Sequence, residues 1–171
     1  MLKRSYADSY YLLGEGSQKS IEAAGIFKSR KLSEGEISLI KIPKVQKGLV
    51  VSTFERDLAF ASDLPVKQHL KEYEILVQNK YVGLNHVDWK SKKYRFNIYS
   101  FPWINGRESS GIVIRRGSKV DTQKFPISAE VFLASTSYRD LETSTFQEYT
   151  VFDSRLVWKL PQYRLPNGRL H

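Results

Sequence analysis

Alternating apolar and polar positions recur in short runs from residue 48 onward, and they predict a chain of β-strands. The runs are rich in valine, isoleucine, tyrosine and phenylalanine, and they lie at residues 48–51, 75–83, 112–114, 129–134, 146–152 and 156–160. Glycine or proline ends several of them, as turns require. Five or six short strands with long connections and little helix predict a mainly β fold, built as a closed or partly closed barrel.

Between two of these strands lies the stretch that is richest in functional side chains. Asn85, His86, Asp88, Trp89 and Lys90 fall within six residues, in what we expect to be a long polar loop. Asparagine and aspartate are also ordinary turn and cap residues. A structural role for Asn85 and Asp88 is therefore as well supported by the pattern as a functional one.

The net charge of +9 raises the question of an anionic partner. The excess is spread along the chain, and its densest cluster mixes basic and aromatic residues: Lys90, Lys92, Lys93 and Arg95 alternate with Trp89, Tyr94 and Phe96. Such a mixture can stack bases and follow a phosphate backbone. Because basic clusters are common on solvated surfaces, we favour a solvated loop and expect no nucleic-acid partner.

The residue inventory argues against a metal centre. The chain has no cysteine, and its three histidines, His69, His86 and His171, are far apart in sequence. A zinc site needs three or four nitrogen, sulfur or carboxylate ligands around one centre, so we expect none. The apolar runs are too short for a transmembrane helix and the N-terminus does not resemble a secretory signal, which together favour a cytoplasmic protein.

Four segments in order resemble a known family: DLPVK, YEILVQNKYVGLNHVDWK, FPWINGRESSGIVIRRG and FQEYTVFDSRLVWKLP. They are similar to the N-terminal, GroES-like domain of the medium-chain dehydrogenase/reductase superfamily, and most similar to its zinc-free, quinone oxidoreductase-like branch. The resemblance implies a GroES-like, partly closed β-barrel with few short helices over residues 46–161. An irregular basic extension, residues 1–45 with one helix candidate at 17–24, precedes it, and a tail, 162–171, follows.

The resemblance also implies roles for individual residues. Asn85 and Asp88 would line the catalytic cleft beside the nicotinamide and the substrate, while Lys90, Arg107 and Glu108 would contact the substrate. Arg107 stands where zinc-dependent members of the superfamily place histidine. From the residue alone, an ion pair or another structural contact is the favoured role for this arginine, ahead of binding a phosphate or carboxylate.

Function follows from the resemblance as two alternatives. The first is the substrate-side domain of a zinc-independent, NADPH-dependent reductase of a small carbonyl or quinone, in which a homodimer is one expectation. The sequence has no glycine-rich dinucleotide fingerprint, so NADPH would be bound mainly by a domain absent here, without which this one is inactive. The second is a non-catalytic trafficking protein, similar to certain fungal raft-associated relatives, whose basic extension contacts an anionic membrane peripherally. The sequence leaves open whether the chain is an enzyme.

Overall fold

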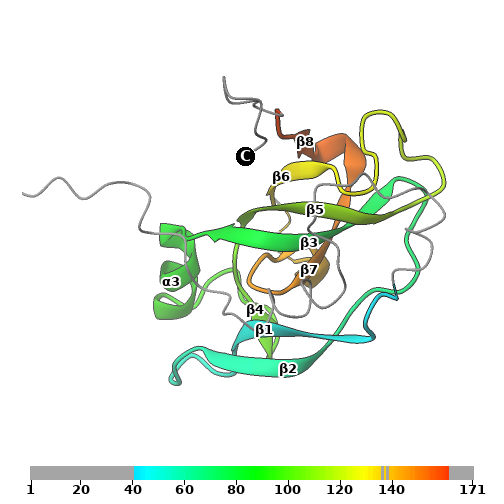
Figure 1. Ribbon diagram of the computed structural model, residues 1–171. Coiled ribbons are helices and arrows are strands. Elements are labelled where there is room, and N and C mark those ends of the chain that lie inside the picture. Colours follow the sequence, from blue (N-terminus) through cyan, green and yellow to red (C-terminus); the bar gives the residue numbers. More distant parts are fainter. Residues whose placement is uncertain (1–40, 136, 138, 162–171) are drawn as a thin grey trace, which may run out of the picture.

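A computed structural model describes residues 41–135, 137 and 139–161 (Figure 1). The described part is mainly β, as the sequence predicts, and its helices are few and short. The helix candidate at 17–24 and the tail at 162–171 lie outside the described residues, as does almost all of the predicted extension. Ile42, just inside the described range, is buried in the core.

The larger sheet has five antiparallel strands in the order β7-β3-β5-β6-β8. They are β3 (Glu74–Gly83), β5 (Glu108–Arg116), β6 (Glu130–Ala134), β7 (Tyr149–Asp153) and β8 (Trp158–Lys159). Strand β3 lies between β7 and β5 and is the longest, because its β-branched and aromatic residues suit a strand with neighbours on both sides. Two register shifts interrupt its pairing with β5, one at Leu76/Val77 and one at Asn79/Tyr81.

The smaller sheet has three antiparallel strands in the order β2-β1-β4, with β1 at Val45–Val51, β2 at Ala59–Pro65 and β4 at Trp103–Ile104. A bridge between Gly48 and Gln147 connects it to the segment before β7. Among the described residues the two sheets do not close into a barrel. The described residues form eight strands where the sequence predicts five or six, because β2 and the two-residue β4 lack a clear alternating pattern.

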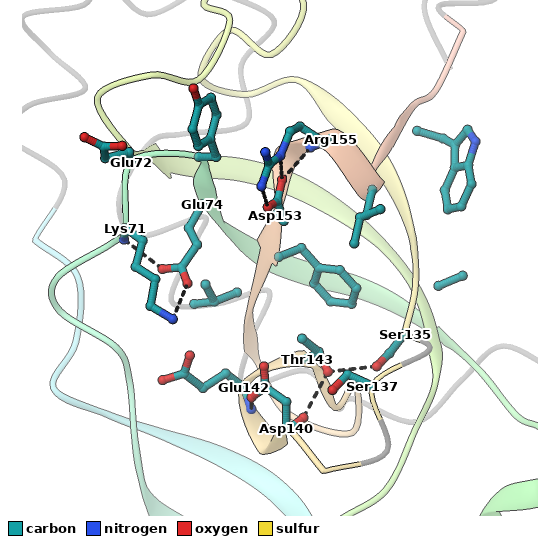
Figure 2. Close-up of a pocket in the computed structure, with 16 residues that line it drawn as sticks. Lys71, Glu72, Glu74, Ser135, Ser137, Asp140, Glu142, Thr143, Asp153 and Arg155 are labelled. Carbon is teal, nitrogen blue, oxygen red and sulfur yellow. Dashed lines mark hydrogen bonds and ion pairs between the residues drawn. The ribbon is translucent and has the colours of Figure 1, made fainter.

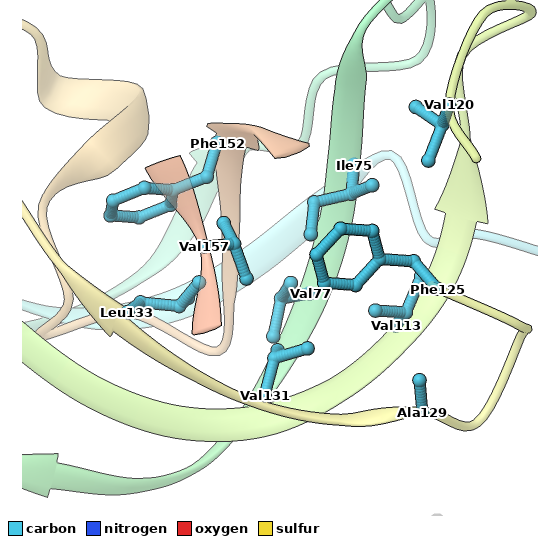
Figure 3. Packing of buried hydrophobic residues seen from close by; sticks show 10 residues of the cluster. All are labelled: Ile75, Val77, Val113, Val120, Phe125, Ala129, Val131, Leu133, Phe152 and Val157. Carbon is cyan, nitrogen blue, oxygen red and sulfur yellow. The ribbon is translucent and has the colours of Figure 1, made fainter. Parts of the chain in front are cut away.

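The main core lies against one face of the larger sheet (Figure 3). Ile75, Val77, Val113 and Val131 from three adjacent strands are fully buried there. Phe125 packs among them, although the charged residues and the proline of segment 118–128 predict an exposed loop there. That expectation is wrong for Phe125 and for the buried Val120, since this segment folds back over the sheet and supplies part of its core.

A buried polar residue fixes the middle of β3. The Asn79 Oδ1 atom accepts hydrogen bonds from Ser109 Oγ (2.9 Å) and Thr150 Oγ1 (3.2 Å). Its Nδ2 donates to the carbonyl oxygens of Gln147 (2.8 Å) and Thr145 (3.3 Å). Burying an amide is favourable only when its hydrogen bonds are made, so Asn79 specifies how β3, β5 and the segment before β7 meet.

The stretch expected to be a long polar loop contains a helix, α3 (His86–Lys93). Asn85 has the extended conformation of an N-cap residue, and its backbone N–H donates to Asp88 Oδ2 at 2.7 Å. Lys90, Lys92 and Lys93 occupy the last turn, where positive charge is favourable beside the C-terminal end of the helix dipole. Two short 3₁₀ helices, η2 (Leu141–Thr143) and η3 (Ser154–Leu156), flank β7. Among the described residues, no helix has the length and apolar character needed to cross a membrane.

Candidate functional site

The two motifs singled out in the sequence meet at one end of the larger sheet, where β3 leads into α3 and β5 begins. The Asn85 side-chain amide donates to Glu108 Oε1 at 2.9 Å. The Gly106 N–H donates to Asp88 Oδ1 at 3.2 Å, and Asn105 Nδ2 donates to the Asp88 carbonyl oxygen at 2.7 Å. We call Asn85, Asp88, Asn105, Gly106 and Glu108 the α3 cluster.

Asp88 is the central acid of this cluster. Burial raises the pKa of its carboxyl group above the ordinary value, and the nearby charge of Glu108 acts in the same direction. The N–H groups of Asn85 and Gly106 and the charge of Arg107 oppose that rise without cancelling it. The cap role that the sequence allowed for Asp88 is therefore present, and the same carboxyl has an altered affinity for protons.

Gly106 makes the turn that aims the second motif at α3. Its φ of +93° favours glycine, and a Cβ atom there would lie 2.5 Å from Thr145 Oγ1 and 2.7 Å from the Phe146 nitrogen. Backbone hydrogen bonds from Thr145 N to the Gly106 oxygen (3.1 Å) and from Phe146 N to the Asn105 oxygen (3.0 Å) hold the turn against this segment. The cluster is therefore fixed from behind by rigid backbone.

Arg107 and Lys90 take different positions around the cluster. Arg107 is only 7% exposed, and its guanidinium donates to the Ser137 carbonyl oxygen at 3.3 Å. Lys90 is exposed, with its ammonium group 5.6 Å from the centre of the Trp89 ring. Arg107 thus has a structural contact, as the sequence allowed, and adds a positive charge near Asp88. Lys90 is placed beside Trp89, and no contact joins it to the α3 cluster among the described residues.

The donor set around α3 suits hydrogen bonding better than metal binding. The described residues contain no group of three or more histidine, aspartate or glutamate side chains placed to hold a metal ion. Asn85 donates one amide hydrogen to Glu108 and offers a metal only its amide oxygen, and Arg107 is a cation that cannot act as a ligand. His86 lies beside the Trp89 ring at 6.4 Å between ring centres.

Sequence patterns do not indicate the pocket of about 470 Å³ that includes the start of β3 (Figure 2). Its lining includes Val151 and Phe152 from β7, together with Glu74, Asp140 and Arg155. These residues come from separate segments, so neither spacing nor a local motif indicates them. The pocket begins at the start of β3, and its side formed by Ala134, Ser135 and Ser137 adjoins the start of β5, where Ala134 pairs with Glu108.

Comparison with known proteins gives the family. The model of the alcohol dehydrogenase GroES-like domain matches residues 71–162, which include β3, α3 and the whole α3 cluster. The chain belongs to the alcohol dehydrogenase GroES-like domain family. This confirms the resemblance to the medium-chain dehydrogenase/reductase superfamily and the GroES-like, mainly β fold that it implies.

Two curated relatives of this GroES-like chain are fungal enzymes. The trans-enoyl reductase iliB of Neonectria sp. (strain DH2) is 30% identical over 117 residues, which cover 61% of this chain and 29% of the relative. The trans-enoyl reductase tndF of Aspergillus flavipes is 31% identical over 91 residues, covering 52% of this chain and 26% of the relative. The chain therefore spans less than a third of the length of either relative.

Solved structures of longer proteins contain the same GroES-like fold. A protein from Rhizobium etli CFN 42, described as a zinc-dependent alcohol dehydrogenase, is 27% identical with a TM-score of 0.55, covering 70% of this chain and 34% of that one. The quinone oxidoreductase of Pseudomonas syringae pv. Tomato DC3000 is 22% identical with a TM-score of 0.55, covering 68% and 34%. The second likeness concerns the fold alone.

Proposed function

We propose that this GroES-like domain forms the substrate side of a zinc-independent, NADPH-dependent reductase that acts on a carbon–carbon double bond conjugated to a carbonyl. The observation that carries the proposal is the α3 cluster, in which Asn85, Asp88 and Glu108 are joined across two separate motifs. Enoyl groups and quinones both contain such a conjugated system. The names of the relatives iliB and tndF support the enoyl form.

The residues of this chain would bind and orient the substrate. NADPH, when bound, supplies the hydride. The Asn85 amide is placed to orient a carbonyl group, and Asp88, with its raised pKa, is placed to hold a proton beside it. Arg107 provides positive charge near Asp88, where charge develops on a reduced carbonyl oxygen, and Lys90, in the last turn of α3, would contact the substrate. Glu108 holds Asn85 in place.

NADPH would be held mainly by another domain. All strand pairings among the described residues are antiparallel, whereas a dinucleotide fold needs parallel strands joined by a helix. Zinc independence is supported by the α3 donor set, in which an amide and a guanidinium occupy the two motifs. A homodimer stays a prediction.

Substrate binding can be tested on the chain itself by NMR. We expect the crotonyl thioester of N-acetylcysteamine, and duroquinone as a quinone probe, to shift the Asn85 side-chain amide and the α3 backbone signals. The Asn85→Ala variant should lose these shifts. Shifts confined to the pocket that includes the start of β3, or their complete absence, would contradict the assignment.

Activity needs a protein that includes the cofactor domain. An antibody against residues 41–161 should remove NADPH-dependent enoyl reduction from an extract of the source cells, and a zinc chelator should leave that activity unchanged. Reduction that persists after depletion would show that this chain takes no part in it. Loss of activity with the chelator would overturn zinc independence.

A further inference from the structure

Large aromatic side chains stand exposed at the α3 end of the molecule. Within thirteen residues of sequence, five aromatic side chains are between 39% and 59% exposed: Trp89, Tyr94, Phe96, Tyr99 and Phe101. Single exposed apolar residues are ordinary, but a group of them this close in sequence is typical of a contact surface, and two of these rings, Trp89 and Tyr94, are neighbours with 6.3 Å between their centres. We call these five residues the aromatic surface.

The aromatic surface is held together by contacts with the loop between β1 and β2. The Phe101 ring packs edge-on against Phe54 with 5.0 Å between ring centres, and Lys92 Nζ donates to the Phe54 carbonyl oxygen at 2.9 Å. Arg95 forms an ion pair with Glu55 at 2.9 Å. The rings are therefore presented by an ordered end of the domain, where α3 projects beyond β3 and β5 in Figure 1.

Positive charge is interleaved with these rings. Residues 86–101 contain four basic side chains and one acid, Asp88, which is turned into the α3 cluster. The ammonium groups of Lys90 and Lys93 both lie 5.6 Å from the centre of the Trp89 ring. Within the described part of the chain, neither lysine forms an ion pair with a carboxylate. The surface therefore combines apolar rings with two ammonium groups, those of Lys90 and Lys93, that have no carboxylate partner among the described residues, while Arg95 is paired with Glu55.

We propose that the aromatic surface docks on an anionic phospholipid membrane. Tryptophan and tyrosine favour the boundary between headgroups and acyl chains, where the ring is partly buried and the polar edge stays hydrated. Lysines beside them gain from negatively charged headgroups while their aliphatic stems rest on the rings. The positive charge and the exposed aromatic rings thus both favour an anionic membrane as the binding partner of this surface.

A single-stranded nucleic acid fits this surface less well. Base stacking needs open ring faces along a groove that follows the backbone, whereas two lysines lie over the Trp89 ring and α3 projects outward. The sequence alone suggested a membrane contact in the basic extension, residues 1–45. The aromatic surface would provide a membrane contact on α3 and the residues that follow it. This proposal goes beyond the proposed reductase function, since Trp89 and Lys93 lie outside the α3 cluster.

Vesicle flotation of the full chain tests the proposal. We expect binding to vesicles of phosphatidylcholine mixed with phosphatidylserine, and weak binding to phosphatidylcholine alone. Lys93→Gln should weaken binding to the anionic vesicles about fivefold, with little effect on the neutral ones. Trp89→Ala should weaken binding to both, because it removes the inserted ring.

Matched variants distinguish this surface from general stickiness. Trp158→Ala removes another half-exposed tryptophan, on β8, and Lys124→Gln removes another lysine beside an aromatic ring. Both should bind vesicles like the wild-type chain, and circular dichroism should show all four variants folded. Unchanged binding of Trp89→Ala and Lys93→Gln would overturn the proposal. So would equal losses in the control variants, or displacement from vesicles by a single-stranded oligonucleotide.

Discussion

The two ends of β3 each hold a carboxylate that is largely shielded from water, and the two carboxylates respond in opposite ways. At the start of the strand, burial acts to raise the pKa of Glu74, but hydrogen bonds from the Lys71 N–H and the Lys67 ammonium lower it overall. Beyond the other end, burial raises the pKa of Asp88 and no ammonium group contacts it. The Glu74 end is built as a stable ion pair, whereas the Asp88 end keeps a carboxyl that can take up a proton.

This difference separates structure from candidate chemistry within one domain. Lys67 lies 3.0 Å from Glu74 and 2.7 Å from Glu142, so it connects the start of β3 to η2 (Figure 2 shows both acids at the pocket). The pKa of Lys67 is raised, because its bonds to the two acids outweigh its burial. A carboxyl group whose pKa is raised within a fixed, polar cluster is more typical of a functional site than a carboxylate held in an ion pair.

The largest loss of stability is expected from Gly106→Ala, which should disrupt the α3 end of the domain. The positive φ of Gly106 is unfavourable for alanine. In addition, atoms of Thr145 and Phe146 occupy the space that the added methyl group would need. We expect a loss of about 3 kcal/mol in the free energy of unfolding, measured by urea denaturation. Gly83→Ala is the control, since the added methyl would lie 3.0 Å from two Glu108 side-chain atoms but 3.7 Å from the Glu108 carbonyl oxygen, so its loss should be smaller. An equal loss in both variants would refute this account.

At the other end, Glu74→Gln should cost less. The variant keeps the shape of the side chain but removes the charge that Lys67 and the Lys71 N–H bind, so we expect about 2 kcal/mol at neutral pH. Glu72→Gln is the matched control, because its pair with Lys119 is more than half exposed on both sides and should contribute below about 0.5 kcal/mol. Similar losses in the two variants would show that burial does not distinguish these pairs.

The sequence predicts the strands of the domain better than it predicts the side-chain clusters at the two ends of β3. Runs of β-branched residues such as Ile75 and Val77 indicate a strand without any knowledge of the fold. Helix α3 was missed because its cap is Asn85 with Asp88, in place of the more familiar serine or threonine with glutamate, and its surface is polar nearly all round. Phe125 was missed because a loop becomes core only through tertiary contacts.

The candidate site shows the same limit. The family resemblance named Asn85, Asp88 and Glu108, but composition and spacing could not bring them together, since 23 residues separate Asn85 from Glu108. The contact depends on the turn at Gly106 and on its backbone bonds to Thr145 and Phe146. The pocket at the Glu74 end depends on even more distant segments, so no local pattern could indicate it.

A smaller effect is expected at the helix cap itself. Asn85→Ala removes the amide that bonds Glu108 and a favourable N-cap residue, so it should cost about 1 kcal/mol and weaken the α3 amide signals in NMR spectra. Asn85→Asp is the informative partner variant, because aspartate also caps helices but places a second carboxylate against Glu108. Relative to the wild type, the Asn85→Asp variant should therefore lose more stability at neutral pH than in acid. The same stability at both pH values would show that the contact with Glu108 is not maintained in solution.

The smallest effect is a change in pH dependence, and it compares the two carboxylates directly. A lowered pKa means that Glu74 contributes stability above its unfolded pKa of about 4, and that this contribution is lost as the pH falls through the folded pKa. A raised pKa gives the opposite dependence of stability on pH. The contribution of Asp88 is complete below its unfolded pKa and is lost as the pH rises through the folded pKa.

Urea denaturation between neutral pH and about pH 3 should therefore separate Asp88→Asn from Glu74→Gln. Acidification should destabilise the Asp88→Asn variant more than the wild type, because the variant lacks the gain from protonating Asp88. The Glu74→Gln variant should lose less than the wild type, because its ion pair is already gone. Parallel profiles for all three proteins would mean that both acids titrate alike in the folded and unfolded chains. The distinction between a structural end and a proton-binding end of β3 would then fail.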